Sequence, residues 1–356
     1  MHAKSVTIRD VAQLAKVSES TVSRVLSEAT TTVSISQETR QRVLSAAGEL
    51  SYQPHRFARA LRGKGTRLLG LIVREIDDPF FASLTEVISS VANEEGFQVV
   101  LGYANSDPAE ALALSEIPDF RHTDGLLLLG DLRESSEDHR FLATIAEDRW
   151  VVSVCRGSQE IVGGIPSVAV DNRVGASMAL EYLHQLGHQR IATIHAGRTG
   201  DLKERYEAYC EFMSARPSEE MGKYIQVDEN SYEGGYRATK NLLSLAHPPT
   251  AIFATDDTMA IGVLSAAADM GRVVPRDVSV IGFDDIKIAA YLRPALTTVR
   301  QPIDQIGRQS VDLLIEMIRK EMLGNPLPRI LVKPELVIRD SCAPPRTDAV
   351  LSQPRP

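Results

Sequence analysis

The first fifty residues have apolar side chains at the spacing of short amphipathic helices. The pattern predicts helices over Ile8–Lys16, from the Ser18 cap through Leu26, and over Gln37–Leu50. Thr7, Ser18 and Ser36 precede these segments as N-cap residues, and Pro54 ends the third. The residues expected to face inward are Ile8, Val11, Ala12, Leu14 and Ala15, then Val22, Val25 and Leu26, then Val43, Leu44, Ala47 and Leu50.

The second of these helices leaves only polar side chains for its outer face. Glu19, Ser20, Ser23 and Arg24 fall there, and the tight turn Val17-Ser18 joins this helix to the first. Two helices joined in this way, the second exposing short polar side chains and an arginine, are typical of a helix-turn-helix that reads the major groove of DNA. We therefore interpret residues 1–55 as a DNA-binding headpiece.

From Arg67 onward, short apolar strands alternate with amphipathic helices. Such alternation predicts parallel, doubly wound sheets with helices on both faces, which bind ligands at the carboxyl ends of their strands. The expected strands are Leu68–Val73, Gln98–Tyr103, Gly125–Leu129, Val151–Cys155, Val168–Val170, Ile191–Ile194, Ala251–Ala254 and Val278–Phe283. The expected helices are Phe80–Glu95, Arg173–Leu186, Leu202–Met213, Gly235–Ala246, Met259–Met270 and Ile303–Leu323.

Composition and charge narrow the class of protein. The 356 residues suit two or three domains, and no apolar run approaches the ~20 residues of a membrane span. No apolar signal segment follows Met1, and the three cysteines lack paired spacing, so we expect a reducing cytoplasm without disulfides, metal or cofactor. Residues 1–66 carry a net charge of +5 and the remainder −13, giving −8 overall. A basic module on an acidic body indicates that one end of the chain binds phosphates.

Sequence motifs along nearly the whole chain resemble those of the lactose/galactose repressor (LacI/GalR) family. In the headpiece they are Thr7–Leu26, Glu38–Val43, Ser51–Pro54 and Ala58–Leu61. In the remainder they are Asp124-Gly125, Val170–Asn172, Gly187-His188, Val280–Asp285 and Pro334–Asp340. The resemblance implies a helix-turn-helix headpiece, a hinge, and a two-lobed core similar to periplasmic sugar-binding proteins.

The resemblance places Glu19, Ser20 and Arg24 at base-reading positions. Their chemistry agrees, because arginine can pair bidentately with guanine and glutamate can accept from cytosine. For Glu19 the alternative is an acid that stabilises the first turn of its helix. Thr21 and Ser23 are interpreted as phosphate contacts, and Thr7 and Ser18 complete the expected DNA-binding set in the headpiece.

Residues 56–66 resemble the family's hinge helix, which orders on DNA and inserts a leucine into the minor groove. Leu61 matches that leucine, and Arg59 is expected to contact DNA beside it. The alternative is that Leu61 is a core residue of a short linker helix. One departure from the family is the loop Ser27–Ile35, which is longer than usual and contains several hydroxyl side chains.

The resemblance also implies an effector pocket between the two lobes of residues 67–340. The expected pocket residues are Asp78, Phe80, Phe81, Arg156, Arg205, Asn230, Asp256 and Asp284. Cys155 stands where many members carry aspartate, and Asn230 where some carry a stacking aromatic, so a nucleobase is disfavoured. A sugar or sugar derivative is expected, and Arg156 and Arg205 leave an anionic one open.

The expected partners are pseudo-palindromic operator DNA, a carbohydrate effector and a second copy of the chain, with a tetramer as the alternative to a dimer. Residues 341–356 are expected to form a disordered tail because they are rich in proline. Two other classes of protein fit the sequence less well. An extracytoplasmic sugar-binding protein would need a signal peptide where the helix-turn-helix stands. An enzyme built on Asp256-Asp257 or Asp284-Asp285 lacks a partner His, Lys or Cys at suitable spacing, and Gly197–Gly200 lacks the ending of a phosphate-binding loop.

Overall fold

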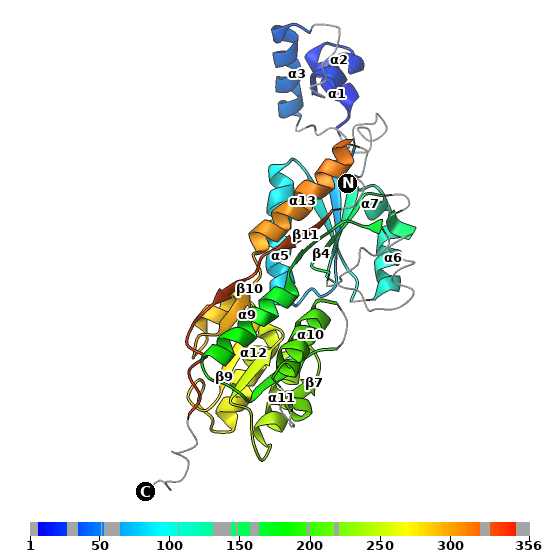
Figure 1. Cartoon of the computed structure of the whole chain (residues 1–356). Coiled ribbons are helices and arrows are strands. Elements are labelled where there is room, and N and C mark those ends of the chain that lie inside the picture. Colours follow the sequence, from blue (N-terminus) through cyan, green and yellow to red (C-terminus); the bar gives the residue numbers. More distant parts are fainter. Residues whose placement is uncertain are drawn as a thin grey trace. The chain divides into compact units, whose positions relative to one another are not determined.

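The computed structural model divides the chain into two compact units, Met1–Arg67 and Leu68–Pro356 (Figure 1). Within them it describes residues 6–26, 35–50, 52, 65–105, 107–130, 144–146, 149–156, 164–197, 200–216, 221–320 and 328–346. The expected hinge contacts Arg59 and Leu61 lie outside the described residues, as does almost all of the long loop after Leu26.

The first unit contains the three expected helices, whose ends agree with the predictions to within one residue. They are α1 (Ile8–Ala15), α2 (Glu19–Leu26) and α3 (Gln37–Glu49). Val11, Val22, Val25 and Val43 form the centre of their small core. Leu14 and Leu44, which were expected to face inward, are instead 44% and 50% exposed. Such short helices bury only a narrow stripe, so these leucines lie beside the core rather than in it.

The second unit contains two six-stranded sheets, which define its two lobes. The sheet of the N-lobe has the order β11-β5-β4-β3-β1-β2, and all its neighbours are parallel. Its strands are β1 (Leu68–Val73), β2 (Gln98–Tyr103), β3 (Gly125–Leu129), β4 (Val151–Val154), β5 (Ser167–Val170) and β11 (Arg329–Val332). The helices of this lobe include α5 (Pro79–Glu94), α6 (Pro108–Glu116), α7 (Pro118–Arg121) and α13 (Ile303–Lys320).

The sheet of the C-lobe has the order β12-β10-β9-β8-β6-β7, with only β12 antiparallel to its neighbour. Its strands are β6 (Ile191–His195), β7 (Ile225–Val227), β8 (Ala251–Ala254), β9 (Ser279–Asp284), β10 (Thr297–Arg300) and β12 (Glu335–Val337). Its helices include α9 (Asn172–Gln185), α10 (Gly200–Ser214), α11 (Tyr232–Leu243) and α12 (Asp257–Asp269), and short turns of 3₁₀ helix are η2 (Met221–Tyr224) and η3 (Lys287–Tyr291). These two sheets confirm the expected α/β fold.

The chain passes between the lobes three times. It leaves the N-lobe after β5 to form α9, returns after β10 to form α13, and leaves again between β11 and β12 (Figure 1). Asn172 begins α9 directly after the first crossing, and Gln301 lies at the second. Both crossings therefore place a polar side chain close to the carboxyl end of a strand.

The prediction that the disordered tail begins at Ser341 is wrong. Ser341 is fully buried, where its hydroxyl donates to Val280 O at 2.6 Å and accepts from Thr297 N at 2.8 Å. The carbonyl of Ala343 lies 2.9 Å from the His188 ring. The proline content mispredicted this segment, because backbone and hydroxyl groups beside the prolines form hydrogen bonds with polar groups at the edge of the C-lobe core. Residues 347–356 lie outside the described part of the chain.

Among the described residues, none of the helices combines the length and the apolar character needed to cross a membrane.

Candidate functional site

The outward face of α2 is the polar surface that the sequence predicts. Val22 and Val25 are buried, whereas Glu19, Ser20 and Arg24 are exposed. Thr21 and Ser23 are half-buried at the sides of the helix. An eight-residue helix held by two valines on one side thus offers hydrogen-bonding side chains on the other.

The turn before α2 is set by local hydrogen bonds. Lys16 adopts a left-handed conformation, with φ of 54°, which reverses the chain after α1. The hydroxyl of Ser18 accepts from Thr21 N at 3.2 Å and also lies 2.8 Å from the Ser20 hydroxyl. At the start of α1, Asp10 accepts from both the backbone N–H and the hydroxyl of Thr7, each at 2.7 Å. Thr7 and Ser18 therefore define the helix starts, whatever else they contact.

In the core, polar side chains follow the carboxyl ends of strands in both sheets. Because neighbouring parallel strands end at one edge, these side chains gather there. On the N-lobe they are Arg74 after β1, Arg156 after β4 and Asn172 after β5. On the C-lobe they are Asn230 after β7, Asp256 after β8, Asp284 at the end of β9 and Gln301 after β10.

Arg205, on α10, is the centre of this polar network. It is 1% exposed, and its guanidinium lies 3.8 Å from the centroid of the Phe283 ring. Nε donates to Asn172 Oδ1 at 2.9 Å, and Nη1 donates to the carbonyl of Thr255 at 2.7 Å. Two carboxylates complete its surroundings, since Asp284 and Asp201 each accept from it at 3.2 Å.

Asp284 ends β9 and faces the guanidinium. Its Oδ1 accepts from Arg205 and, at 2.6 Å, from Gln301 Nε2. Its backbone φ of 116° is strained for a residue with a side chain, and such strain is concentrated at functional positions. Burial raises the pKa of Asp284 well above the usual value, while the neighbouring arginine opposes that shift.

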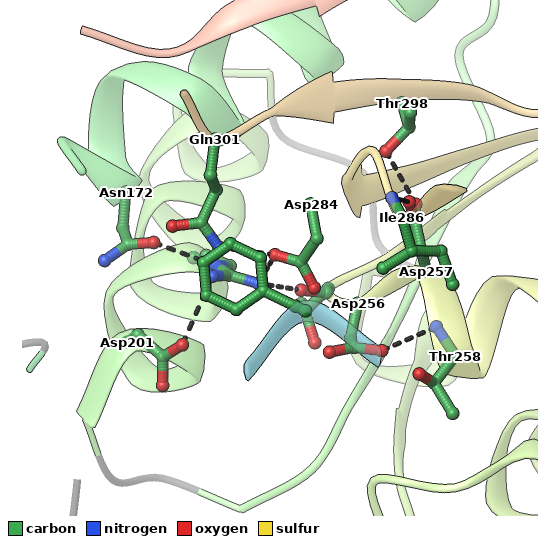
Figure 2. A network of polar contacts seen from close by, with 12 residues as sticks. Asn172, Asp201, Asp256, Asp257, Thr258, Asp284, Ile286, Thr298 and Gln301 are labelled. Carbon is green, nitrogen blue, oxygen red and sulfur yellow. Dashed lines mark hydrogen bonds and ion pairs between the residues drawn. The ribbon is translucent and has the colours of Figure 1, made fainter. Parts of the chain in front are cut away.

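The adjacent aspartates Asp256 and Asp257 have separate roles. Asp256 caps α12 by accepting from Thr258 N at 2.6 Å. Asp257 points toward β10, where it accepts from Thr298 Oγ1 at 2.6 Å and from Ile286 N at 3.0 Å (Figure 2). Burial raises the pKa of Asp257 to about 8. The pair therefore presents one carboxylate at the strand end and uses the other to hold the loop after β9.

The N-lobe contributes Arg74, Asp78 and two phenylalanines. Asp78 caps α5 by accepting from Phe80 N at 2.8 Å. Burial and, next, the charge of Asp256 raise the pKa of Asp78 to about 7. Phe80 lines a cavity of about 380 Å³ together with Asp284 and Gln301. Phe81 is 1% exposed and packs under the Arg74 guanidinium, 4.7 Å from its ring centroid.

The structure thus brings Arg205, Asp256, Asp284 and Phe80 together. Arg156 and Asn230 are half-buried at the ends of β4 and β7, and no hydrogen bond connects Asn230 Oδ1 to another described residue. Sequence reasoning missed four members of the network, Arg74, Asn172, Asp201 and Gln301. Three of these directly follow strands, so reading every strand end would have found them, whereas Asp201 is identified only by its position one helical turn before Arg205.

Comparisons with known proteins cover both units. Residues 7–55 match the family "Bacterial regulatory proteins, lacI family", and residues 180–342 match the family "Periplasmic binding protein-like domain". The repressor CytR of Escherichia coli (strain K12) is 34% identical over 339 residues, covering 94% of this chain and 96% of that protein. The repressor PurR of Klebsiella pneumoniae (strain 342) is 33% identical over 347 residues, covering 95% and 97%.

Solved structures show the same architecture. The lac repressor dimer bound to operator and the anti-inducer ONPF aligns with a TM-score of 0.84 at 26% identity, covering 96% of this chain and all of that one. The complex of the transcriptional regulator CelR with cellobiose aligns with a TM-score of 0.70 at 30% identity, covering 94% and 99%.

Proposed function

The chain belongs to the LacI family of bacterial regulatory proteins, and we propose that it is a repressor that reads operator DNA through α2 and senses a carbohydrate in the crevice around Arg205. DNA binding under the control of a small-molecule effector follows from membership of this family. The residues that do this and the chemistry of the effector are the further content of the proposal.

The DNA contacts are assigned from the exposed face of α2. Arg24 is placed to donate to guanine, Glu19 to accept from cytosine and Ser20 to do either. Thr21 and Ser23, at the sides of the helix, are suited to phosphate oxygens. We propose that Arg59 and Leu61 of the hinge add minor-groove contacts, on the strength of the family motif at 58–61.

The effector contacts are assigned from the facing strand ends. Arg205, Asp256 and Asp284 supply a guanidinium and two carboxylates, which suit the paired donors and acceptors of a sugar. Phe80 adds an aromatic surface on the N-lobe side. Relatives of known structure include complexes described with cellobiose and with ribose, which support a carbohydrate effector.

Assembly and location complete the proposal. A homodimer is proposed because the lac repressor, which aligns over 96% of this chain, is described as a dimer on its operator. A two-fold protein implies a pseudo-palindromic site. A cytoplasmic location and the absence of catalysis are proposed for the same reason, since the relatives are transcriptional repressors.

One observation carries the proposal: a single chain contains both α2, with Glu19, Ser20 and Arg24 exposed, and a buried polar network at the strand ends of a two-lobed core. The test is to select DNA from a random pool with the full chain and then titrate the selected DNA in the presence of neutral sugars. A palindromic consensus whose affinity changes with one sugar is expected. Binding of random and selected DNA with equal affinity would contradict it.

A further inference from the structure

Two of the arginines around the crevice, Arg205 and Arg74, are already paired with carboxylates of the protein. Arg205 has an acceptor at each of its nitrogens, two of them carboxylates, and an aromatic ring against its face. Four of the five N–H donors of Arg205 are used by these acceptors, so one donor remains for a ligand hydroxyl, which is too few for the bidentate fork that carboxylate and phosphate ligands form.

Arg74 is paired with carboxylates by ion pairs that are longer than hydrogen bonds. Its Nη1 lies 3.6 Å from Asp201 Oδ1, on the opposite lobe, and its Nε lies 3.5 Å from Glu75 Oε1. The Phe81 ring covers one face of its guanidinium. Asp201 therefore bridges the two arginines, with Oδ1 toward Arg74 and Oδ2 toward Arg205.

The carboxylates, by contrast, keep accepting capacity. Asp78, Asp256 and Asp284 each use only Oδ1 for hydrogen bonds within the described part of the protein. Asp201 Oδ1 is buried and accepts no hydrogen bond from any described residue, beyond its longer ion pair with Arg74. A buried acceptor without a donor is costly, and a ligand hydroxyl can satisfy it.

The charge of the crevice is consequently unbalanced. Five acidic side chains, Glu75, Asp78, Asp201, Asp256 and Asp284, outnumber the three arginines of the crevice, Arg74, Arg156 and Arg205. Burial is the main cause of the raised pKa of Asp78 and of Glu75, and the neighbouring carboxylates add to both shifts.

From this arrangement we infer that the effector is a neutral, hydroxyl-rich molecule that donates hydrogen bonds to the aspartates, and that Asp201 makes the crevice reject phosphorylated and acidic sugars. This inference rests on the proposed effector site. An anionic group entering the crevice meets carboxylate oxygens at close range, while Arg205 has most of its donors occupied and Arg74 is already paired with Glu75 and Asp201. Hydroxyl groups meet acceptors in the geometry that they need.

The experiment uses the full chain and matched pairs of ligands. Glucose is compared with glucose 6-phosphate and glucuronate, and ribose with ribose 5-phosphate, alongside a wider panel of neutral sugars and their phosphates. Thermal shift identifies binders, and calorimetry measures their affinities. In each pair of which at least one member binds, we expect the neutral sugar to bind at least tenfold more tightly than its phosphate or uronate. Tighter or equal binding of a phosphate or uronate overturns the inference, as does failure of every neutral sugar to bind.

A charge variant tests the role of Asp201. Asp201→Asn removes one negative charge and releases donors of Arg74 and Arg205, so discrimination against the phosphate in each pair should fall at least fivefold. Asp201→Glu keeps the charge and should restore the discrimination. Asp269→Asn, which changes an exposed carboxylate at the end of α12, is the control and should leave it unchanged. The ratio of two affinities is independent of the folded fraction, so moderate destabilisation does not obscure the result. If Asp201→Asn discriminated against the phosphates as strongly as the wild type does, Asp201 would not be the residue that rejects them.

DNA binding by the same protein sample separates this inference from the proposed function. If the chain selects no specific DNA, the proposed function fails. If it selects DNA but responds only to anionic sugars, the inference alone fails.

Discussion

Gln301 donates from Nε2 to Asp284 Oδ1 at 2.6 Å and thereby connects the second crossing between the lobes to the end of β9. Asn172, just after the first crossing, accepts from Arg205 in a similar way. An effector that binds Arg205 and Asp284 therefore contacts groups held by two of the three connections between the lobes. We therefore expect a change in the spacing of the lobes to change the contacts that the effector makes.

Replacing Asp284 should uncouple the effector from DNA. In Asp284→Asn we expect effector binding to weaken by about 1–3 kcal/mol, because the carboxylate that accepts ligand hydroxyls is lost. DNA binding without effector should be preserved, and asparagine tolerates the positive φ at this position. Calorimetry with the cognate sugar provides the measurement. Unchanged affinity of Asp284→Asn for the sugar would show that Asp284 does not contact the effector.

Arg24 should carry base specificity. Arg24→Ala is expected to cost about 1–3 kcal/mol on the selected operator and to relax preference at one base pair of each half-site. Arg9→Ala removes one positive charge from the exposed side of α1 and is the matched control. Fluorescence anisotropy with operator and scrambled DNA distinguishes the two. If Arg24→Ala lost equal affinity for both DNAs, the side chain would be a phosphate contact.

The pKa of Asp257 predicts a pH dependence of stability. Burial raises that pKa to about 8 in the folded protein, whereas the pKa of an aspartate in the unfolded chain is about 3.9. The protonated carboxyl thus contributes its full stability below about pH 4 and loses it as the pH rises toward 8. In urea titrations, the stability of the wild type relative to Asp257→Asn should therefore fall between pH 5 and 8. A constant difference between the wild type and Asp257→Asn across this range would refute the shift.

The buried hydroxyl of Ser341 should stabilise the C-lobe. Ser341→Ala leaves Thr297 N without its side-chain acceptor and Val280 O with only the weak Cys342 thiol donor, so we expect a loss of about 1–3 kcal/mol in the free energy of unfolding. Ser244→Ala, at the exposed end of α11, is the control and should change stability by less than about 0.5 kcal/mol. Equal effects of the two changes on the free energy of unfolding would show that the Ser341 hydroxyl does not stabilise the C-lobe.

Operator DNA should change effector affinity by the same factor by which the effector changes DNA affinity. Reciprocity requires this of any two linked binding equilibria, and a coupling of about 1–3 kcal/mol corresponds to about 5–150-fold. Calorimetry of the full chain with and without saturating operator measures the factor. Equal effector affinities in the two titrations, despite an effect of effector on DNA binding, would exclude the linkage.

The amino-acid sequence alone determined the elements, the fold and the recognition surface. Helical spacing around Val11, Val22 and Val43 settles which face of α2 is free, because burial of a small core leaves one choice. Apolar strands alternating with helices indicate a parallel α/β fold, and each of the eight expected strands begins and ends within one residue of its observed position. The strands β7, β10, β11 and β12 were not predicted. These features depend on local periodicity, which the sequence displays directly.

Only the tertiary structure decided which charges face one another. Asp201 and Arg74 lie more than a hundred residues apart, and no local pattern indicates that one carboxylate bridges two arginines from different elements. Ser341 likewise reads as the start of a polar tail until Val280 and Thr297 are found beside it. The strength of an ion pair or a buried hydrogen bond depends on distance and on the surrounding dielectric, and folding sets both. An arginine that the sequence leaves open to an anionic ligand is, in the fold, already paired.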